Sequence, residues 1–189
     1  MRMPLPLLAV LLLAPALGSA APTAPAPVPP PQQHDGAHDF DFLIGDWKAH
    51  LRRLPDRLAG SSTWIEYDGF SRHKKLLDSN ANFEEFEVEG RDRSQHIKGQ
   101  TLRLYNPASR QWSIFLLDLD KGVLPMPPVV GQFAGKTGEF YDQEEYKGRM
   151  ILVRYQWNNL SPTAARMEQA FSADAGKTWE VNWICELSR

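Results

Sequence analysis

The residues of this sequence that can bind a metal ion are few and scattered. No two of the five histidines lie at ligand spacing on one predicted strand; they are His34, His38, His50, His73 and His96. A zinc or transition-metal site needs several such side chains brought together. An acidic run could hold calcium weakly but is more typical of a solvated strand face or a protected edge; it comprises Glu84, Glu85, Glu87 and Glu89. We therefore expect no metal site.

Groups suited to covalent or acid–base catalysis are equally sparse. The single cysteine, Cys185, lies in an alternating apolar segment with no adjacent basic residue to activate it. The sequence has no Gly-x-Ser-x-Gly elbow and no glycine-rich phosphate loop. Glu66 and Asp68 would share one strand face, a spacing compatible with acid–base work. With His50 and Lys48 opposite, they also fit a solvated cross-strand charge network. We favour the network and expect no catalytic residue and no cofactor.

The charge balance argues against some classes of partner. The chain has 189 residues, with 21 Lys plus Arg against 23 Asp plus Glu, and a formal net charge of -2. Its 42% hydrophobic residues are ordinary for a globular protein. Without a basic excess, there is no electrostatic reason to expect binding to nucleic acid or to an anionic membrane surface.

The first residues predict export. Residues 1–20 have the pattern of a secretory signal peptide, because Arg2 precedes an apolar run over 5–17 that ends in small residues. The run is shorter than the ~20 residues that a bilayer-spanning helix needs, so we expect no membrane span in the mature form. Residues 21–37 are rich in Ala and Pro and predict an extended linker. The folded domain is then 38–189, in a periplasmic or secreted protein.

The elements that must position any site are strands. Apolar residues after Phe42 mostly alternate with polar ones, and no long segment keeps a helical period. Turn-forming residues separate many of the alternating segments, which indicates an all-β barrel or sandwich. The predicted strands are 47–53, 63–70, 83–89, 101–105, 112–118, 129–133, 138–145, 150–157, 164–171 and 179–187. A short helical turn is expected within 39–44.

The last hairpin contains a turn motif. Residues 172–179 fit Ser-x-Asp-x-Gly-x-Thr-Trp, an Asp-box, in which Asp174 bonds nearby amides and Gly176 takes a positive φ. Asp-boxes occur in sialidases, but a lone copy is a turn-building device, so we expect a structural role here. We pair Phe171 with Trp179 across the turn. One face is then shared by Trp179, Val181, Trp183, Cys185 and Leu187.

The first hairpin can be registered in the same way. With 54–62 as its connection, His50 lies near Glu66 and Lys48 lies near Asp68. One face is then charged. The other face is apolar, as expected for a barrel wall between core and water, and carries Trp47, Ala49, Leu51, Ile65 and Tyr67.

A motif at the start of the first predicted strand suggests a family. Phe42-Leu43-Ile44-Gly45-Asp46-Trp47 contains Gly-x-Trp, which resembles the signature of the calycin superfamily of lipocalins, fatty-acid-binding proteins and nitrobindin-like proteins. The resemblance implies that Trp47 packs across one barrel end and that a late basic residue stacks on it. Arg189 is the nearest candidate and Arg154 is the alternative. Nitrobindin-like proteins bind haem through a late histidine, and this chain has none after His96, so we expect no haem.

A longer similarity covers residues 40–189. The chain resembles an uncharacterised, often exported, bacterial calycin-like family, a domain of unknown function. The resemblance rests on 42–47, on 102–107 followed by 111–114, and on the closing block 171–189. It implies a single antiparallel up-and-down β-barrel of about 8–10 strands and carries no catalytic residue across. The residues expected to be structural are Gly45, Trp47, Asp174, Gly176, Trp179 and Arg189.

The segment 122–131 is apolar and stiffened by proline. It predicts either a corner packed against the barrel end or a lid whose Leu124 and Met126 touch a hydrophobic guest. Ligand-pocket candidates along the chain are Trp47, Tyr67, Leu124, Met126, Arg154, Tyr155, Met167 and Trp183.

These observations favour a non-enzymatic exported barrel that binds a small hydrophobic or amphipathic molecule. One alternative is an enzyme with an active site in the cavity, which would need inward titratable groups such as Arg154, Tyr155 or Glu168. Another alternative is an interaction module without a small ligand. The sequence leaves open whether aromatic side chains line the barrel or fill it, and it leaves the oligomeric state open.

Overall fold

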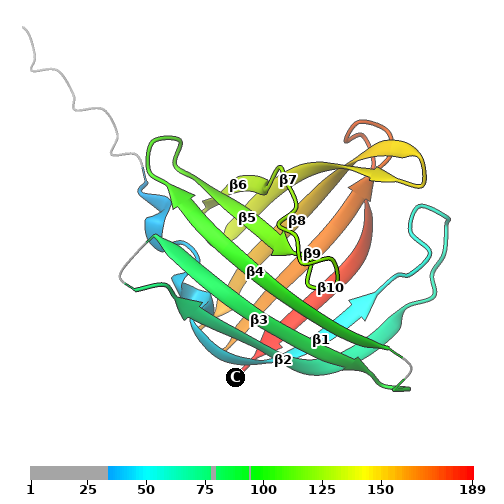
Figure 1. Cartoon of the computed structure of the whole chain (residues 1–189), viewed down its shortest axis with the longest axis horizontal. Helices are drawn as coiled ribbons and strands as arrows, with labels where there is room; N and C mark the ends of the chain where they lie inside the picture. Colours follow the sequence, from blue (N-terminus) through cyan, green and yellow to red (C-terminus); the bar gives the residue numbers. More distant parts are fainter. Residues whose placement is uncertain (1–33, 78–79, 94) are drawn as a thin grey trace, which may run out of the picture. The chain divides into compact units, whose positions relative to one another are not determined.

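Ten antiparallel strands close into a single up-and-down barrel, which confirms the predicted fold (Figure 1). The computed structural model describes residues 34–77, 80–93 and 95–189. The predicted signal peptide and most of the predicted linker lie outside these residues. The strands are β1 (Gly45–Arg53), β2 (Ile65–Lys75), β3 (Ala81–Gly90), β4 (His96–Asn106), β5 (Gln111–Leu117), β6 (Val129–Ala134), β7 (Thr137–Tyr146), β8 (Arg149–Ser161), β9 (Ala164–Ser172) and β10 (Glu180–Ser188). Each overlaps one predicted strand.

Each strand pairs with its chain neighbours, and β1 also pairs with β10 to close the barrel. Two short 3-10 turns, η1 (Gly36–His38) and η2 (Asp41–Leu43), precede β1 and lie at one end (Figure 1). The described residues from His34 to Arg189 belong to one compact unit, and the boundary at residue 38 stays a prediction. Because the strands run alternately up and down, the connections after β1, β3, β5, β7 and β9 all lie at the opposite end. Among the described residues, no helix has the length and apolar character to span a bilayer.

The end of the barrel beside η1 and η2 is filled by aromatic side chains. Phe40 has no solvent exposure, and its ring packs edge-on against Trp112 and Phe133, with centroid distances of 5.1 and 4.9 Å. The turns are tied to this core by the Trp112 Nε1–H, which donates to the Gly36 carbonyl at 2.9 Å. We call this part the filled half.

Trp47 lies at the filled end, and Arg189, the candidate that the family resemblance implies, lies over its ring with Cζ 4.0 Å from the centroid. The Trp47 indole N–H donates to the Leu43 carbonyl at 2.6 Å, and Arg189 Nη1 donates to the Ile44 carbonyl at 2.9 Å. Gly45, two residues before Trp47, has a φ of 119°, a conformation that favours glycine. These contacts join the start of β1 to the residue that follows β10.

The predicted register of the first hairpin is wrong by two residues. His50 pairs with Asp68 rather than Glu66, because the connection extends to Trp64 and Arg53 pairs with Ile65. A shift of two residues keeps every side chain on its predicted face. Trp47, Ala49 and Leu51 are accordingly buried, as expected.

The predicted register of the last hairpin is also wrong. Phe171 pairs with Glu180 instead of Trp179, and an irregularity between Val181 and Trp183 shifts the ladder once more, so that Gln169 faces Trp183. A bulge of this kind breaks the alternation of faces. Trp179 therefore does not share the inner face with Trp183.

The Asp-box itself builds the turn before β10. The Asp174 carboxylate accepts hydrogen bonds from the Thr178 amide and hydroxyl at 2.9 and 2.7 Å, and these bonds lower the pKa of Asp174 to about 2. Gly176 has a φ of 85° and accepts a bond from the Trp179 indole at its carbonyl.

The barrel wall has its shortest strand pairing between β5 and β6. β6 pairs with β5 over only three residue pairs, from Trp112–Gly131 to Ile114–Val129. Prolines at 125, 127 and 128 lack the N–H that would extend the ladder, so β6 begins only at Val129. The segment that precedes it leaves the wall, and Leu124 and Met126 are 48% and 68% exposed.

Candidate ligand-binding cavity

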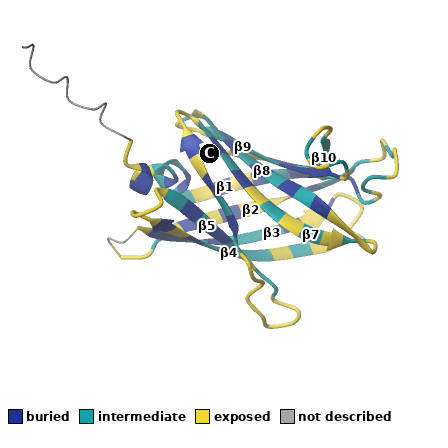
Figure 2. Ribbon diagram, turned by 90° about the horizontal axis from the view of Figure 1, so that it is seen from above, coloured by how far each residue is buried: buried dark blue, intermediate teal, exposed yellow. Residues whose placement is uncertain are grey.

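The half of the barrel away from η1 and η2 contains a cavity of about 260 Å³. Its wall is formed by β3, β4, β5, β8, β9 and β10, and the connection after β1 contributes Arg57. Figure 2 shows exposed residues on the loops around this end of the barrel. The lining residues are Arg57, Glu84, Phe86, Ile97, Lys98, Gly99, Gln100, Thr101, Leu116, Leu117, Tyr155, Gln169 and Trp183. We call this part the open half.

The cavity wall is largely apolar and aromatic. The rings of Phe86 and Trp183 lie 6.4 Å apart, and Ile97 and Leu116 complete this side. Gly99 leaves further room, because a Cβ atom placed there would come no closer than 3.9 Å to Phe86. The site thus offers an apolar surface on which a small molecule can pack.

Several buried polar atoms on this wall have no hydrogen-bond partner within the described protein. They are the Gln169 Oε1 acceptor, the Trp183 Nε1 donor and the Arg57 Nε donor. The other end of the Gln169 amide is fixed, since its Nε2 donates to the Tyr155 hydroxyl at 2.7 Å. A buried polar atom without a partner costs about 1–3 kcal/mol, so such atoms are uncommon and call for an explanation. This wall thus contains two donors and one acceptor that are left unpaired.

The floor of the cavity is a buried polar cluster. Arg103 and Glu84 form an ion pair in which both side chains are almost fully buried. Arg103 Nη1 also donates to Asn82 Oδ1 at 3.1 Å, and the guanidinium lies 5.1 and 5.2 Å from the ring centroids of Phe40 and Trp157. Arg103 therefore separates the filled half from the open half.

His73 and Ser71 complete this cluster as one directed chain of hydrogen bonds. Ser71 Oγ donates to Glu84 Oε1 at 2.8 Å, so it accepts from His73 Nε2, also at 2.8 Å. His73 Nδ1 is then free to accept from Arg103 Nη1 at 3.3 Å. This assignment describes a neutral imidazole with its proton on Nε2.

The electrostatics of the cluster agree with that assignment. Burial lowers the pKa of His73 to about 4, and the Arg103 charge adds to this effect while Glu84 opposes it. Burial alone would raise the pKa of Glu84, but the Arg103 guanidinium, together with His73 and the Ser71 hydrogen bond, holds it well below its usual range. At neutral pH the cluster thus contains an ionised Arg103–Glu84 pair and a neutral histidine.

This arrangement is poorly suited to nucleophilic catalysis. Ser71 has no solvent exposure, and its hydroxyl donates a hydrogen bond to Glu84. Neither Ser71 nor His73 lines the cavity. Burial raises the pKa of the Tyr155 hydroxyl and of the Cys185 thiol, which keeps both protonated at neutral pH. Among the described residues, no group of three His, Cys, Asp or Glu side chains could hold a metal ion.

The predicted pocket residues have different positions in the structure. Tyr155 and Trp183 line the cavity. Trp47, Tyr67 and Met167 pack within or against the core but not on the cavity wall.

The remaining pocket candidates point away from the cavity. Arg154 lies on the outer face of β8, because its neighbour Tyr155 faces inward. Its guanidinium lies 4.8 Å from the Trp179 ring centroid. Leu124 and Met126 are exposed and do not line the cavity, because the proline-rich segment that holds them leaves the wall.

The other eleven residues that line the cavity were not predicted as pocket residues from the sequence, and three of them show why. Phe86 has the alternation of a strand residue and could have been found from it. Gln169 is polar at an inward position, where an apolar pattern gives no signal. Arg57 lies in a connection without periodicity, so only the folded structure brings it to the cavity.

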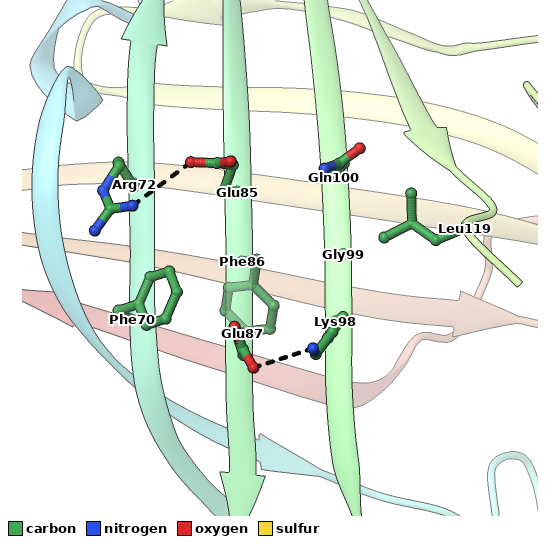
Figure 3. Close-up of a pocket in the computed structure, with 9 residues that line it drawn as sticks. All are labelled: Phe70, Arg72, Glu85, Phe86, Glu87, Lys98, Gly99, Gln100 and Leu119. Carbon is green, nitrogen blue, oxygen red and sulfur yellow. Dashed lines mark ion pairs between the residues drawn. The ribbon is translucent and has the colours of Figure 1, made fainter.

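A second depression lies on the outer surface of β2, β3 and β4 (Figure 3). It has a volume of about 310 Å³ and is bordered by Phe70 and Leu119. Its charged groups are engaged with one another: Arg72 lies 3.7 Å from Glu85, and Lys98 lies 3.5 Å from Glu87. The cavity inside the barrel, with its unpartnered polar atoms, is therefore the better candidate site.

Comparison with known proteins supports the fold. No protein-family model matches the sequence, and no curated protein matches it. Among solved structures, the chain is similar to the S-type phycobiliprotein lyase CPES from Guillardia theta, with a TM-score of 0.54 and 13% identity over 79% of this chain and 89% of that one. At this identity the likeness establishes a lipocalin-like barrel fold alone.

Proposed function

We propose that this protein binds a small amphipathic molecule in the cavity of the open half. The observation that carries the proposal is the combination of an apolar wall with the unpartnered polar atoms of Gln169 and Trp183. Barrels of about this strand number have an interior that can hold one small ligand. The volume of about 260 Å³ is below the ~300–1,000 Å³ of common ligand pockets, so the guest is small.

Carriage is a better account of this cavity than catalysis. The inward acidic groups of the cavity are engaged with the protein itself: Glu84 is held by Arg103, and Tyr155 accepts a bond from Gln169. A general acid or base needs a pKa near the working pH, and neither the depressed pKa of Glu84 nor the raised pKa of Tyr155 lies there. These observations support binding without chemical conversion.

The site of action that we propose is outside the cytoplasm. Its support is the signal-peptide pattern of residues 1–20 and the similarity to an exported calycin-like family. Expression of the full chain with a functional export system should yield a mature protein that has lost the first twenty residues, as measured by intact mass. Recovery of the full-length mass from the cytoplasm alone would contradict export.

Ligand binding can be tested by filling the cavity. Isothermal titration calorimetry with octan-1-ol should give saturable binding to the wild-type protein. Gly99→Leu, which places a side chain in open space on the wall, should weaken this binding at least tenfold. The matched control is Ala134→Leu, an exposed position on β6 in the filled half, where binding should be unchanged. Equal affinity of wild type and folded Gly99→Leu would contradict the proposal.

A further inference from the structure

Two arginines stand at the mouth of the open half. Arg53 is the last residue of β1 and pairs with Trp183 across the β1–β10 ladder. Arg57 follows four residues later, lines the cavity and places its guanidinium 5.0 Å from the Phe171 ring centroid. The Nε atom of each arginine is buried and has no hydrogen-bond partner within the described protein.

The backbone holds Arg57 in this place. The Leu54 amide donates to the Asn182 carbonyl at 2.8 Å, and the Leu58 amide donates to Glu180 Oε1 at 2.6 Å. Both bonds anchor the connection after β1 against β10. Arg57 lies between the two anchored residues, so its direction toward the cavity is a consequence of the fold.

The two guanidinium groups are close enough to repel each other. Burial lowers the pKa of Arg57, and the charge of Arg53 lowers it further. Two like charges in a partly buried site are unfavourable unless an anion compensates them. The described residues include no carboxylate within ion-pair distance of either arginine, although many such pairs occur elsewhere on the protein.

The charged groups that face these arginines come from β7 and from the cavity floor. Asp142 and Glu144 lie two and four residues after the inward-facing Phe140, on the same face of β7. The pKa of Glu144 is raised by its own burial and by Asp142. Glu84, at the floor, is already paired with Arg103. The mouth thus presents two arginines without an ion-pair partner among the described residues. Glu144, opposite them, is near enough for its charge to attract Arg57, and together with Asp142 it would repel a second negative charge on a guest.

We propose that the guest is an amphipathic monocarboxylate whose head group binds between Arg53 and Arg57. This inference rests on the proposed function, since the same cavity receives the apolar part of the guest. The carboxylate accepts hydrogen bonds from the guanidinium N–H groups of the two arginines, whose planar geometry it matches. The apolar part packs below it against Phe86, Leu116 and Trp183. The carboxylates of β7 select a single negative charge.

The test compares molecules that differ only in the head group. By calorimetry, octanoate should bind wild type at least tenfold more tightly than octan-1-ol, and octanedioate should bind more weakly than octanoate. Arg57→Gln and Arg53→Gln should each reduce the preference for octanoate over octan-1-ol, the ratio of the two affinities, at least tenfold, whereas Arg57→Lys should retain part of the preference. The matched control is Arg52→Gln. Arg52 lies on the same strand as Arg53 but points outward, over the ring of Trp64.

The outcomes separate this inference from the proposed function. If octan-1-ol and octanoate bind equally and Gly99→Leu abolishes both, the cavity binds a guest and the carboxylate assignment is wrong. The assignment is also wrong if Arg52→Gln weakens octanoate as much as Arg57→Gln does. If neither compound binds to the folded wild-type protein, both proposals are overturned. Thermal melts of each variant establish that the comparison is between folded proteins.

Discussion

Three tryptophans show how the two halves of the barrel differ. In the filled half, the indole N–H groups of Trp47 and Trp112 donate to the backbone carbonyls of Leu43 and Gly36. In the open half, the buried indole N–H of Trp183 has no partner within the described protein. The same side chain therefore serves packing at one end and is available for recognition at the other. If the proposed binding is correct, stability and binding are located in separate halves of one barrel.

The boundary between the halves gives the largest expected effect. Arg103→Met removes the buried partner of Glu84 and leaves a carboxylate in a site that water does not reach. Such a loss costs about 3–5 kcal/mol, which urea unfolding would measure as a lower midpoint. Gln169→Met, a control in the open half, should change the free energy of unfolding by less than about 1 kcal/mol, since it replaces a partly satisfied amide. Similar losses for both variants would break the comparison.

The second prediction concerns pH. Unfolded His73 takes up a proton near pH 6.5, whereas in the folded protein its pKa is about 4, so the free energy of unfolding falls as the pH is lowered through that interval. The expected loss is about 3 kcal/mol, and Glu84, whose pKa is also depressed, adds to it below pH 4.5.

The matched variant tests where this slope comes from. His73→Gln should flatten the dependence of unfolding free energy on pH between 6.5 and 4 in urea titrations, because it removes the titrating group. His96→Gln, at a half-exposed position on β4, should leave the dependence as in wild type. An unchanged slope in His73→Gln would show that the buried cluster does not govern acid stability.

The smallest effects come from one substitution made in both halves. At Gly138, in the filled half, a Cβ atom would lie 2.8 Å from ring atoms of Phe133 and Phe140. Gly138→Ala should therefore cost about 1–3 kcal/mol by overpacking. Gly99→Ala, in the open half, should stay within about 0.5 kcal/mol, because the nearest atoms are 3.9 Å away. Thermal unfolding measures both, and equal effects would mean that the two halves are equally packed.

The sequence predicted the fold because most strands carry their own alternation of polar and apolar residues. β1 shows this clearly, since Trp47, Ala49 and Leu51 are buried while Lys48 and His50 are not. The turn geometry of the Asp-box likewise follows from neighbouring residues, chiefly Asp174 and Gly176. These patterns are local, so they can be recognised in the sequence before it is known which strand pairs with which.

The candidate site was predictable only in part, because it depends on pairings that no local pattern fixes. Tyr155 and Trp183 were expected in the pocket and lie there. The bulge before Trp183 moved Trp179 out of the expected face, and Arg57 reaches the cavity through hydrogen bonds to β10. Registers and long-range anchors of this kind are set by the assembled barrel rather than by neighbouring residues.

Pairing of β1 with β10 has a consequence for how the molecule is made. β1 is the first strand of the barrel in the chain and β10 is the last, so the outer edge of β1 has no partner until β10 is in place. A sheet that lacks β10 has two free edges, and unpaired strand edges readily pair with strands of other chains. Arg189 follows β10 and lies over the Trp47 ring, so this contact forms only once the barrel has closed.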